Sequence, residues 1–284
     1  MDTMTPAAVL RRREMVCTSA GEIDVVIDAP ENGAGPAIVL LPSSQRDSLD
    51  FDPLAQQLAL LGHRVLRPQP RGMGRTTLPL EPLTLHGLAR DVIDTVQALG
   101  GGSAVLVGHA FGHFIARVAD MDHPQCVRGV VVAGAAARVF PAGMAESLDL
   151  ASDSRQPAAL RIAHLQRAFF APGNDPKAWL EGWHPELRAI YRAAGRVPPK
   201  DRWWTVANAP VLDLQGAQDP WRPPESRGEL QDLLGAQQVT VQVIDQASHA
   251  LVVEQPVAVA AAIARWMALL PEGGGRSAGA AHGV

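Results

Sequence analysis

The chain has 284 residues, of which 47% are hydrophobic and 19% charged, and its formal net charge at pH 7 is −4. This length and composition suit one large domain, or one domain with an insertion, and exclude a disordered chain. The sequence has no basic stripe of the kind that binds nucleic acid, and no run reaches the roughly 18 apolar residues of a membrane span. Met1–Val9 lacks the apolar core of a signal peptide. We therefore expect a cytoplasmic protein.

The first half of the chain alternates strand patterns with helix patterns. Glu14–Ser19 and Glu22–Asp28 are predicted to pair as a hairpin across the short turn Ala20-Gly21. Further strands are predicted at Ala37–Leu41, His63–Arg67, Ala104–Val107 and Arg128–Ala133, and helices at Pro53–Leu61, His86–Leu99 and Ala110–Asp120. This alternation predicts an α/β fold with a mostly parallel sheet and helices on both faces.

The alternation stops after residue 136. Residues 137–207 contain only helical patterns and loops, such as Pro157–Phe170, Asp175–Glu181 and Pro185–Ala194. Strands return at Val211–Gln215 and Val239–Ile244, and a last helix is predicted over Gln255–Leu270. We therefore expect an α/β core over residues 14–136 and 208–270, a helical cap over 137–207, and a disordered tail over 271–284 that is rich in Gly, Ala and Ser.

Two cysteines lie far apart in the sequence. Cys17 and Cys126 both occur in apolar stretches, so we interpret them as buried free thiols rather than as a disulfide.

A tight turn follows the central predicted strand. Residues 104–112 read Ala-Val-Leu-Val-Gly-His-Ala-Phe-Gly, which is the strand–turn–helix frame of a G-x-S-x-G nucleophile elbow with Ala110 in the nucleophile position. In such a frame, the N–H after the middle residue, here Phe111, forms half of an oxyanion hole. The alternative is a plain turn flanked by Gly108 and Gly112, because a short pattern with two glycines is weak by itself.

Two candidate catalytic residues follow predicted strands downstream of this turn. Asp219 comes after Val211–Gln215 and is either a turn residue before Pro220 or the acid of a catalytic pair. His249 comes after the last predicted strand and precedes the last helix. Because ligands of open parallel sheets bind beyond the carboxyl ends of the strands, these loops are the expected site. There Asp219 would orient the imidazole of His249, which would act as general base and then as general acid.

These motifs together resemble the α/β-hydrolase superfamily over about residues 14–270. The order elbow, acid, histidine is the order of that family, and Pro70-Arg71-Gly72-Met73-Gly74-Arg75 is similar to its R-G-x-G-x-S loop. The helical segment 137–207 resembles the cap of the subset that holds small esterases, lactonases, carbon–carbon bond hydrolases, epoxide hydrolases and haloalkane dehalogenases. The resemblance implies an α/β-hydrolase fold.

The sequence departs from the family pattern at two places. Ala110 stands where esterases carry Ser and dehalogenases carry Asp. The loop after Ala37–Leu41 usually begins His-Gly in the family, but here it continues Pro42-Ser43-Ser44. By alignment, the Ser44 amide would be the second oxyanion donor, whereas Ser43 and Ser44 could instead hydrogen-bond a substrate or a water.

Aromatic residues are concentrated in and just after the predicted cap. They are Phe169, Phe170, Trp179, Trp183, Tyr191, Trp203, Trp204 and Trp221. Two interpretations stay open, namely packing of the cap on the core or an apolar lid over a mid-sized hydrophobic substrate. In the second interpretation Trp183 and Trp221 are candidate substrate-binding residues.

Three functions are compatible with these residues. The favoured one is a hydrolase that acts on a small-to-medium apolar carbonyl substrate, an ester, lactone or related compound, with Ala110 either natural or a replacement of serine that traps substrate. Lyase or oxygenase chemistry by the His249 base, without a nucleophile, is the second, and a non-catalytic ligand-binding protein is the third. No His, Asp or Glu cluster has metal-ligand spacing and no phosphate loop is present, so we expect no metal and no cofactor. The expected partner is a small-molecule substrate rather than nucleic acid or a membrane, and a homo-oligomer is left open.

Overall fold

A computed structural model describes residues 8–31 and 35–271 of the chain. The tail predicted over 271–284 lies outside these ranges except for its first residue. Among the described residues, no helix is long and apolar enough to cross a bilayer.

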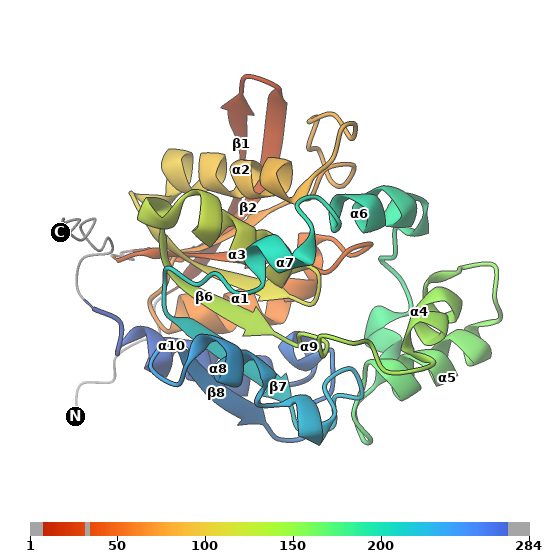
Figure 1. Cartoon of the computed structure of the whole chain (residues 1–284). Helices are drawn as coiled ribbons and strands as arrows, with labels where there is room; N and C mark the ends of the chain where they lie inside the picture. Colours follow the sequence, from red (N-terminus) through yellow and green to blue (C-terminus); the bar gives the residue numbers. More distant parts are fainter. Residues whose placement is uncertain (1–7, 32–34, 272–284) are drawn as a thin grey trace.

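The centre of the molecule is an eight-stranded sheet in the order β1-β2-β4-β3-β5-β6-β7-β8 (Figure 1). Strands β3 to β8 run parallel to one another, whereas β1 and β2 form the predicted antiparallel hairpin at one edge. The strands are β1 (Val9–Thr18), β2 (Gly21–Pro30), β3 (Ala37–Leu41), β4 (Val65–Pro68), β5 (Ala104–His109), β6 (Val127–Ala133), β7 (Val211–Gly216) and β8 (Val239–Ile244). The predicted α/β fold with a mostly parallel sheet is confirmed.

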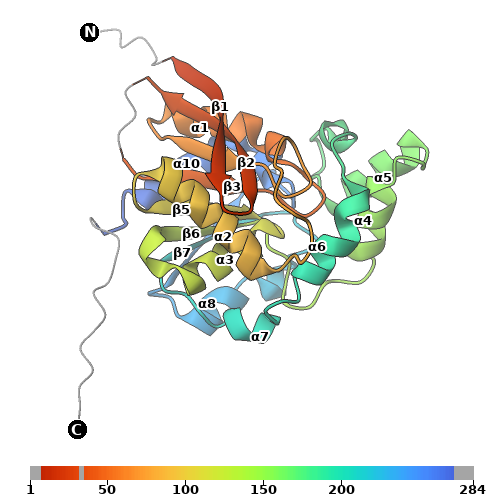
Figure 2. The same ribbon diagram turned by 90° about the horizontal axis from the view of Figure 1, so that it is seen from above.

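Helices cover both faces of this sheet (Figures 1 and 2). Helices α2 (Leu85–Thr95) and α3 (Gly112–Asp122) pack together on one face, and α1 (Asp52–Leu60) and α10 (Pro256–Met267) pack together on the other. The short helices α8 (Glu229–Leu234) and α9 (Leu251–Glu254) complete these layers. The predicted last helix is α10, and the chain breaks at Gln255 between α9 and α10 because Pro256 cannot donate a helix hydrogen bond.

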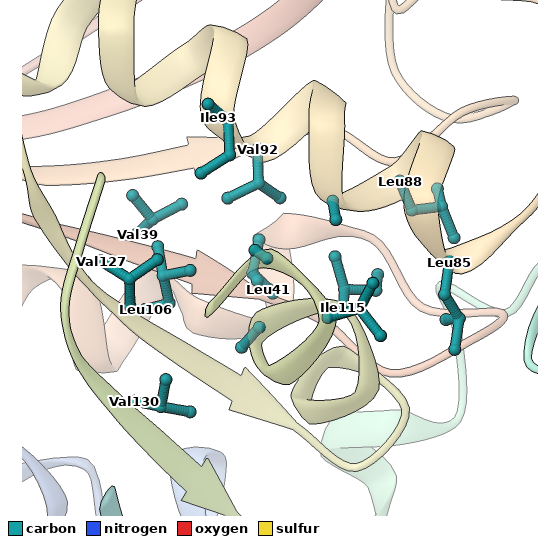
Figure 3. Close-up of a cluster of buried hydrophobic side chains, with 14 of the residues drawn as sticks. Val39, Leu41, Leu85, Leu88, Val92, Ile93, Leu106, Ile115, Val127 and Val130 are labelled. Carbon is teal, nitrogen blue, oxygen red and sulfur yellow. The ribbon is translucent and has the colours of Figure 1, made fainter. Parts of the chain in front are cut away.

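Successive side chains of the buried strands point to opposite faces of the sheet, so each face has its own hydrophobic core. In β3, Val39 belongs to the core under α2 and α3, whereas Ile38 and Leu40 belong to the core under α1 and α10. Figure 3 shows Ile93 and Ile115 pointing from α2 and α3 toward the first of these cores. Because both faces are covered, the central strands read as continuous apolar runs.

The segment between β6 and β7 contains helices and turns only among the described residues. It holds α4 (Met144–Ser152), α5 (Ala158–Ala168), α6 (Arg188–Ala194), α7 (Lys200–Trp203) and the 3₁₀ turns Pro176–Trp179 and Pro185–Leu187. Helices α4 and α5 lie side by side at one end of the sheet (Figures 1 and 2). This segment therefore stands beyond the carboxyl ends of β5 and β6, where the candidate site is expected.

The two cysteines are free, but only one of them is buried. Cys126 is buried before β6, as predicted, whereas Cys17 is exposed. The prediction for Cys17 is wrong because β1 is an edge strand whose side chains lie largely outside the core.

Candidate active site

The turn between β5 and α3 has the backbone of a nucleophile elbow. Ala110 adopts φ +45°, a left-handed conformation that costs a non-glycine residue about 1–3 kcal/mol. A Cβ at Gly108 would lie 2.3 Å from His113 N, and one at Gly112 would lie 2.1 Å from Leu41 O. Both glycines are therefore required by close approach of the backbone, and the alternative of an ordinary glycine-flanked turn does not account for the strain at Ala110.

Asp219 and His249 meet behind this turn, as predicted from their positions after β7 and β8. His249 Nδ1 lies 3.0 Å from Asp219 Oδ2, and both side chains are buried. The Trp221 N–H donates to the other carboxylate oxygen, Asp219 Oδ1, at 2.8 Å. Because the carboxylate accepts a hydrogen bond from Nδ1–H, Nε2 of the imidazole is left as the basic nitrogen.

The histidine loop is held from two sides. His109 Nε2 donates to the His249 carbonyl oxygen at 2.8 Å. Burial lowers the pKa of His109 to about 3, with the nearby His249 as a second cause, so His109 is neutral and serves as a hydrogen-bond donor. On the other side, Glu254 accepts the N–H groups of Ser248 and Ala171, each at 2.6 Å. Burial raises the pKa of Glu254. These contacts fix the backbone of Ser248 and His249 and thereby the position of the imidazole.

The predicted oxyanion residues lie around Ala110. Ser43, Ser44 and Phe111 line the same cavity as Ala110 and His249. Among the described residues, no carbonyl or side chain accepts the N–H of Ser44 or Phe111. Both N–H groups are therefore free to receive a developing negative charge, as oxyanion donors must be.

The cavity over the elbow has a volume of about 250 Å³. Aromatic rings surround the imidazole: the centroid of His249 lies 5.1 Å from that of Trp221 and 5.7 Å from that of Phe169. Trp179 and Trp183 also line the cavity. Such an apolar enclosure with few polar groups is typical of a small-molecule site.

The seven aromatic residues named in the sequence analysis for segment 137–207 divide between the two predicted roles. Phe169, Trp179 and Trp183 line the cavity, whereas Phe170, Tyr191, Trp203 and Trp204 are buried elsewhere. Trp203 and Trp204 lie against the Arg117 guanidinium, with its carbon 5.5 and 5.2 Å from the ring centroids. The first three are thus placed to contact a ligand and the last four to pack the segment on the core.

Several cavity residues were not found by sequence reasoning. Gln45 and His113 are buried, yet Gln45 Oε1 and His113 Nε2 have no hydrogen-bond partner among the described residues. The cavity is also lined by the basic side chains of Arg46, Arg188, Arg192, Arg196 and Lys200. The four-residue spacing of Arg188 and Arg192 was a usable signal, because it places both on one face of a helix, although Arg196, four residues further on, lies beyond the end of α6.

No group of three or more metal-ligating side chains occurs in residues 8–31 and 35–271. The absence of a metal or cofactor from the chemistry stays a prediction.

A mostly parallel sheet with an elbow after β5, an acid after β7 and a histidine after β8 defines a protein of the hydrolase type. The chain belongs to the alpha/beta hydrolase family, whose family model matches residues 38–262. The predicted hydrolase resemblance is therefore confirmed.

Relatives of the chain include named hydrolases. The chain is 28% identical over 194 residues to an epoxide hydrolase from Caballeronia sordidicola, and the match covers 60% of this chain and 57% of that enzyme. The chain thus spans a little over half of the length of that relative.

Solved structures show the same fold. A thermophilic esterase from Thermogutta terrifontis superimposes with a TM-score of 0.69 and 22% identity, covering 91% of this chain and 98% of the esterase. A bromoperoxidase from Bacillus anthracis superimposes with a TM-score of 0.71 and 18% identity, covering 90% of this chain and 100% of the other.

Proposed function

We propose that this protein is an enzyme that cleaves an ester, lactone or related carbonyl bond, with His249 as general base and Asp219 as the residue that orients it. The observation that carries the proposal is the buried Asp219–His249 pair, 3.0 Å apart, whose imidazole lines the same cavity as the elbow. A protein that only binds a ligand has no need of an oriented base. The hydrolytic activity in the name of the epoxide hydrolase relative also supports the proposal.

Water is the attacking group in this proposal, because Ala110 offers no atom that could form an acyl-enzyme. His249 Nε2 takes a proton from the water while the water oxygen bonds to the carbonyl carbon. The N–H groups of Phe111 and Ser44 stabilise the resulting oxyanion. The bond to the leaving group then breaks, and His249 returns the proton to that group.

Segment 137–207 acts as a cap in this proposal. It supplies Phe169, Trp179 and Trp183 to the cavity wall, and these apolar side chains lower the access of water to the part of the cavity beside His249. The apolar surroundings strengthen the hydrogen bonds to the oxyanion.

The proposal is tested by removing the base. Turnover is measured on a panel of aryl esters and lactones of graded chain length, and His249→Ala is expected to lower kcat by about 10²- to 10⁴-fold, the usual contribution of a general base. The matched control is His86→Ala, because His86 also pairs with an aspartate, Asp122, at 2.6 Å but is a surface residue outside the cavity. Equal turnover in the His249→Ala variant and the unchanged protein would refute the proposal.

A further inference from the structure

We propose that the substrate is an amphipathic carboxylate whose anionic group binds Arg192, Arg196 and Lys200 while its apolar part lies among the aromatic residues beside His249. These three cationic residues are called the basic wall below. This inference rests on the proposed function, because it names the class of substrate for the same site.

The charges that line the cavity have one sign. Five lining residues are Arg or Lys, and among the described lining residues none is Asp or Glu. The whole chain has a net charge of −4, so this cluster does not follow from an overall excess of basic residues. A cavity lined by one sign of charge and by apolar walls concentrates ligands of the opposite sign.

Two of the five cations are already paired within the protein. The Arg46 guanidinium binds the Asp50 carboxylate, and Arg188 binds Asp149. Arg46 also lies over the rings of Trp179 and Trp183 and is buried. These pairs are structural: the first lies within the loop after β3 and the second within segment 137–207. Arg46 also donates to the Glu181 carbonyl oxygen at 2.6 Å, which ties that loop to the segment.

The residues of the basic wall have no such partner. No carboxylate among the described residues forms an ion pair with Arg192, Arg196 or Lys200. Among the described residues, the Lys200 ammonium contacts the Arg138 carbonyl oxygen at 3.4 Å and lies 3.9 and 5.8 Å from the ring centroids of Trp204 and Phe114, all of them uncharged groups. The cavity therefore presents positive charge that an anionic ligand can neutralise.

Helix α6 directs this charge into the cavity next to the elbow. Arg188 and Arg192 are four residues apart on α6 and therefore share one face, and Arg196 lies in the turn after the helix and lines the same cavity. Between Arg192 and Arg196, Gly195 lies directly against the Phe111 ring, since a Cβ there would be 3.0 Å from Phe111 Cε2. Arg192 and Arg196 are exposed, which places them where the cavity opens to solvent.

Lys200 is partly withdrawn from water beside these arginines. Burial, with the nearby Arg138 as the next cause, lowers the pKa of Lys200 to about 8. A bound carboxylate would relieve this repulsion and favour the charged ammonium. The charged groups that act on Lys200 are Arg138, Arg117, Arg222 and Glu229, of which only Glu229 is acidic.

The experiment compares a carboxylate with its neutral amide, which has nearly the same size and shape. Binding of 4-phenylbutyrate and of 4-phenylbutyramide is measured by titration calorimetry in low salt. We expect the carboxylate to bind about tenfold more tightly, because charge-assisted hydrogen bonds to guanidinium groups are strong. Raising the ionic strength to about 0.5 M should shrink this preference, because the two arginines are exposed.

Variants assign the preference to the basic wall. The double substitution Arg192→Ala with Arg196→Ala should abolish it, and Arg196→Glu should reverse it; both arginines are exposed, so folding is retained and can be checked by circular dichroism. Arg202→Ala is the matched control, because Arg202 is an exposed arginine of α7 outside the cavity lining. Equal binding of the two ligands, no binding of either, or a preference that survives the double substitution would overturn the inference.

The inference and the proposed function can fail separately. His249→Ala should keep the preference for the carboxylate, because the imidazole does not belong to the basic wall. If that variant also keeps its turnover, the proposed function fails while the ligand preference stands.

Discussion

Replacing Asp219 by asparagine should disable His249 without moving it. The carboxylate accepts two hydrogen bonds, from Trp221 N–H at 2.8 Å and from His249 Nδ1 at 3.0 Å. An asparagine has one acceptor oxygen and one donor amide. The Trp221 N–H can only donate, so the asparagine oxygen should turn toward it and the amide NH₂ toward His249.

The imidazole then has to accept a hydrogen bond at Nδ1. Its proton moves to Nε2, the nitrogen that must receive a proton from water. In serine proteases, where an aspartate orients a histidine in the same way, this change lowers kcat by about 10⁴-fold. That factor corresponds to roughly 5.5 kcal/mol of activation free energy. We expect a loss of this order in Asp219→Asn.

Two assays check this reasoning independently. Turnover on any substrate that the unchanged protein accepts gives the loss in kcat, and nitrogen NMR of the imidazole gives the tautomer without a substrate. The His249 signals are assigned by their absence in His249→Ala. A loss of less than tenfold in kcat, or an Nδ1–H tautomer that persists in Asp219→Asn, would refute this account of the pair.

Three further predictions concern the elbow and the basic wall. In Ala110→Ser, the strained backbone at position 110 should hold the new hydroxyl beside His249, so a fluorophosphonate should label the variant and leave the unchanged protein unlabelled. A variant that stays unlabelled would contradict the elbow geometry. Gly112→Ala should lose about 4 kcal/mol or more of unfolding free energy, because the new Cβ would collide with Leu41 O. In the control Gly87→Ala, the new Cβ in α2 would meet no atom closer than 3.5 Å, so the unfolding free energy should rise by up to about 1 kcal/mol; both are measured by urea titration. Affinity for 4-phenylbutyrate should fall as the pH rises through about 8, because Lys200 loses its positive charge there, and this step should be missing in Lys200→Met.

The position of the Asp219–His249 pair could be predicted because it depends on strand order. Asp219 and His249 each follow a predicted strand, and parallel strands end at one edge of a sheet, so residues 30 positions apart meet at 3.0 Å. The elbow was recognised from its two glycines, both of which the close approach of the backbone requires.

The ligand-facing surface was harder to predict, because it depends on how segment 137–207 folds over the core. Trp203 and Trp183 have the same chemistry in the sequence, yet the first is fully buried beside Arg117 and the second lines the cavity. The interpretation of the aromatic residues as an apolar lid therefore overlooked Arg192, near the end of α6, and Arg196, in the turn after it.

Long-range hydrogen bonds also have no local signature. The bond from His109 to the His249 carbonyl joins residues 140 positions apart, and nothing in the neighbourhood of either residue predicts it. For this reason, the structural role of an isolated histidine can rarely be assigned from the sequence.

The shared carboxylate of Glu254 has a consequence for the timing of catalysis. It binds the backbone beside His249 through Ser248, and it binds the residues after α5 through Ala171 and Asn174, whose side-chain amide lies 2.7 Å away. Lifting the residues after α5 to admit a substrate would leave this buried carboxylate without two of its donors. In the proposed mechanism, the His249 base would therefore be fully supported only while the site is covered, so closure over the substrate and readiness to transfer a proton would occur together.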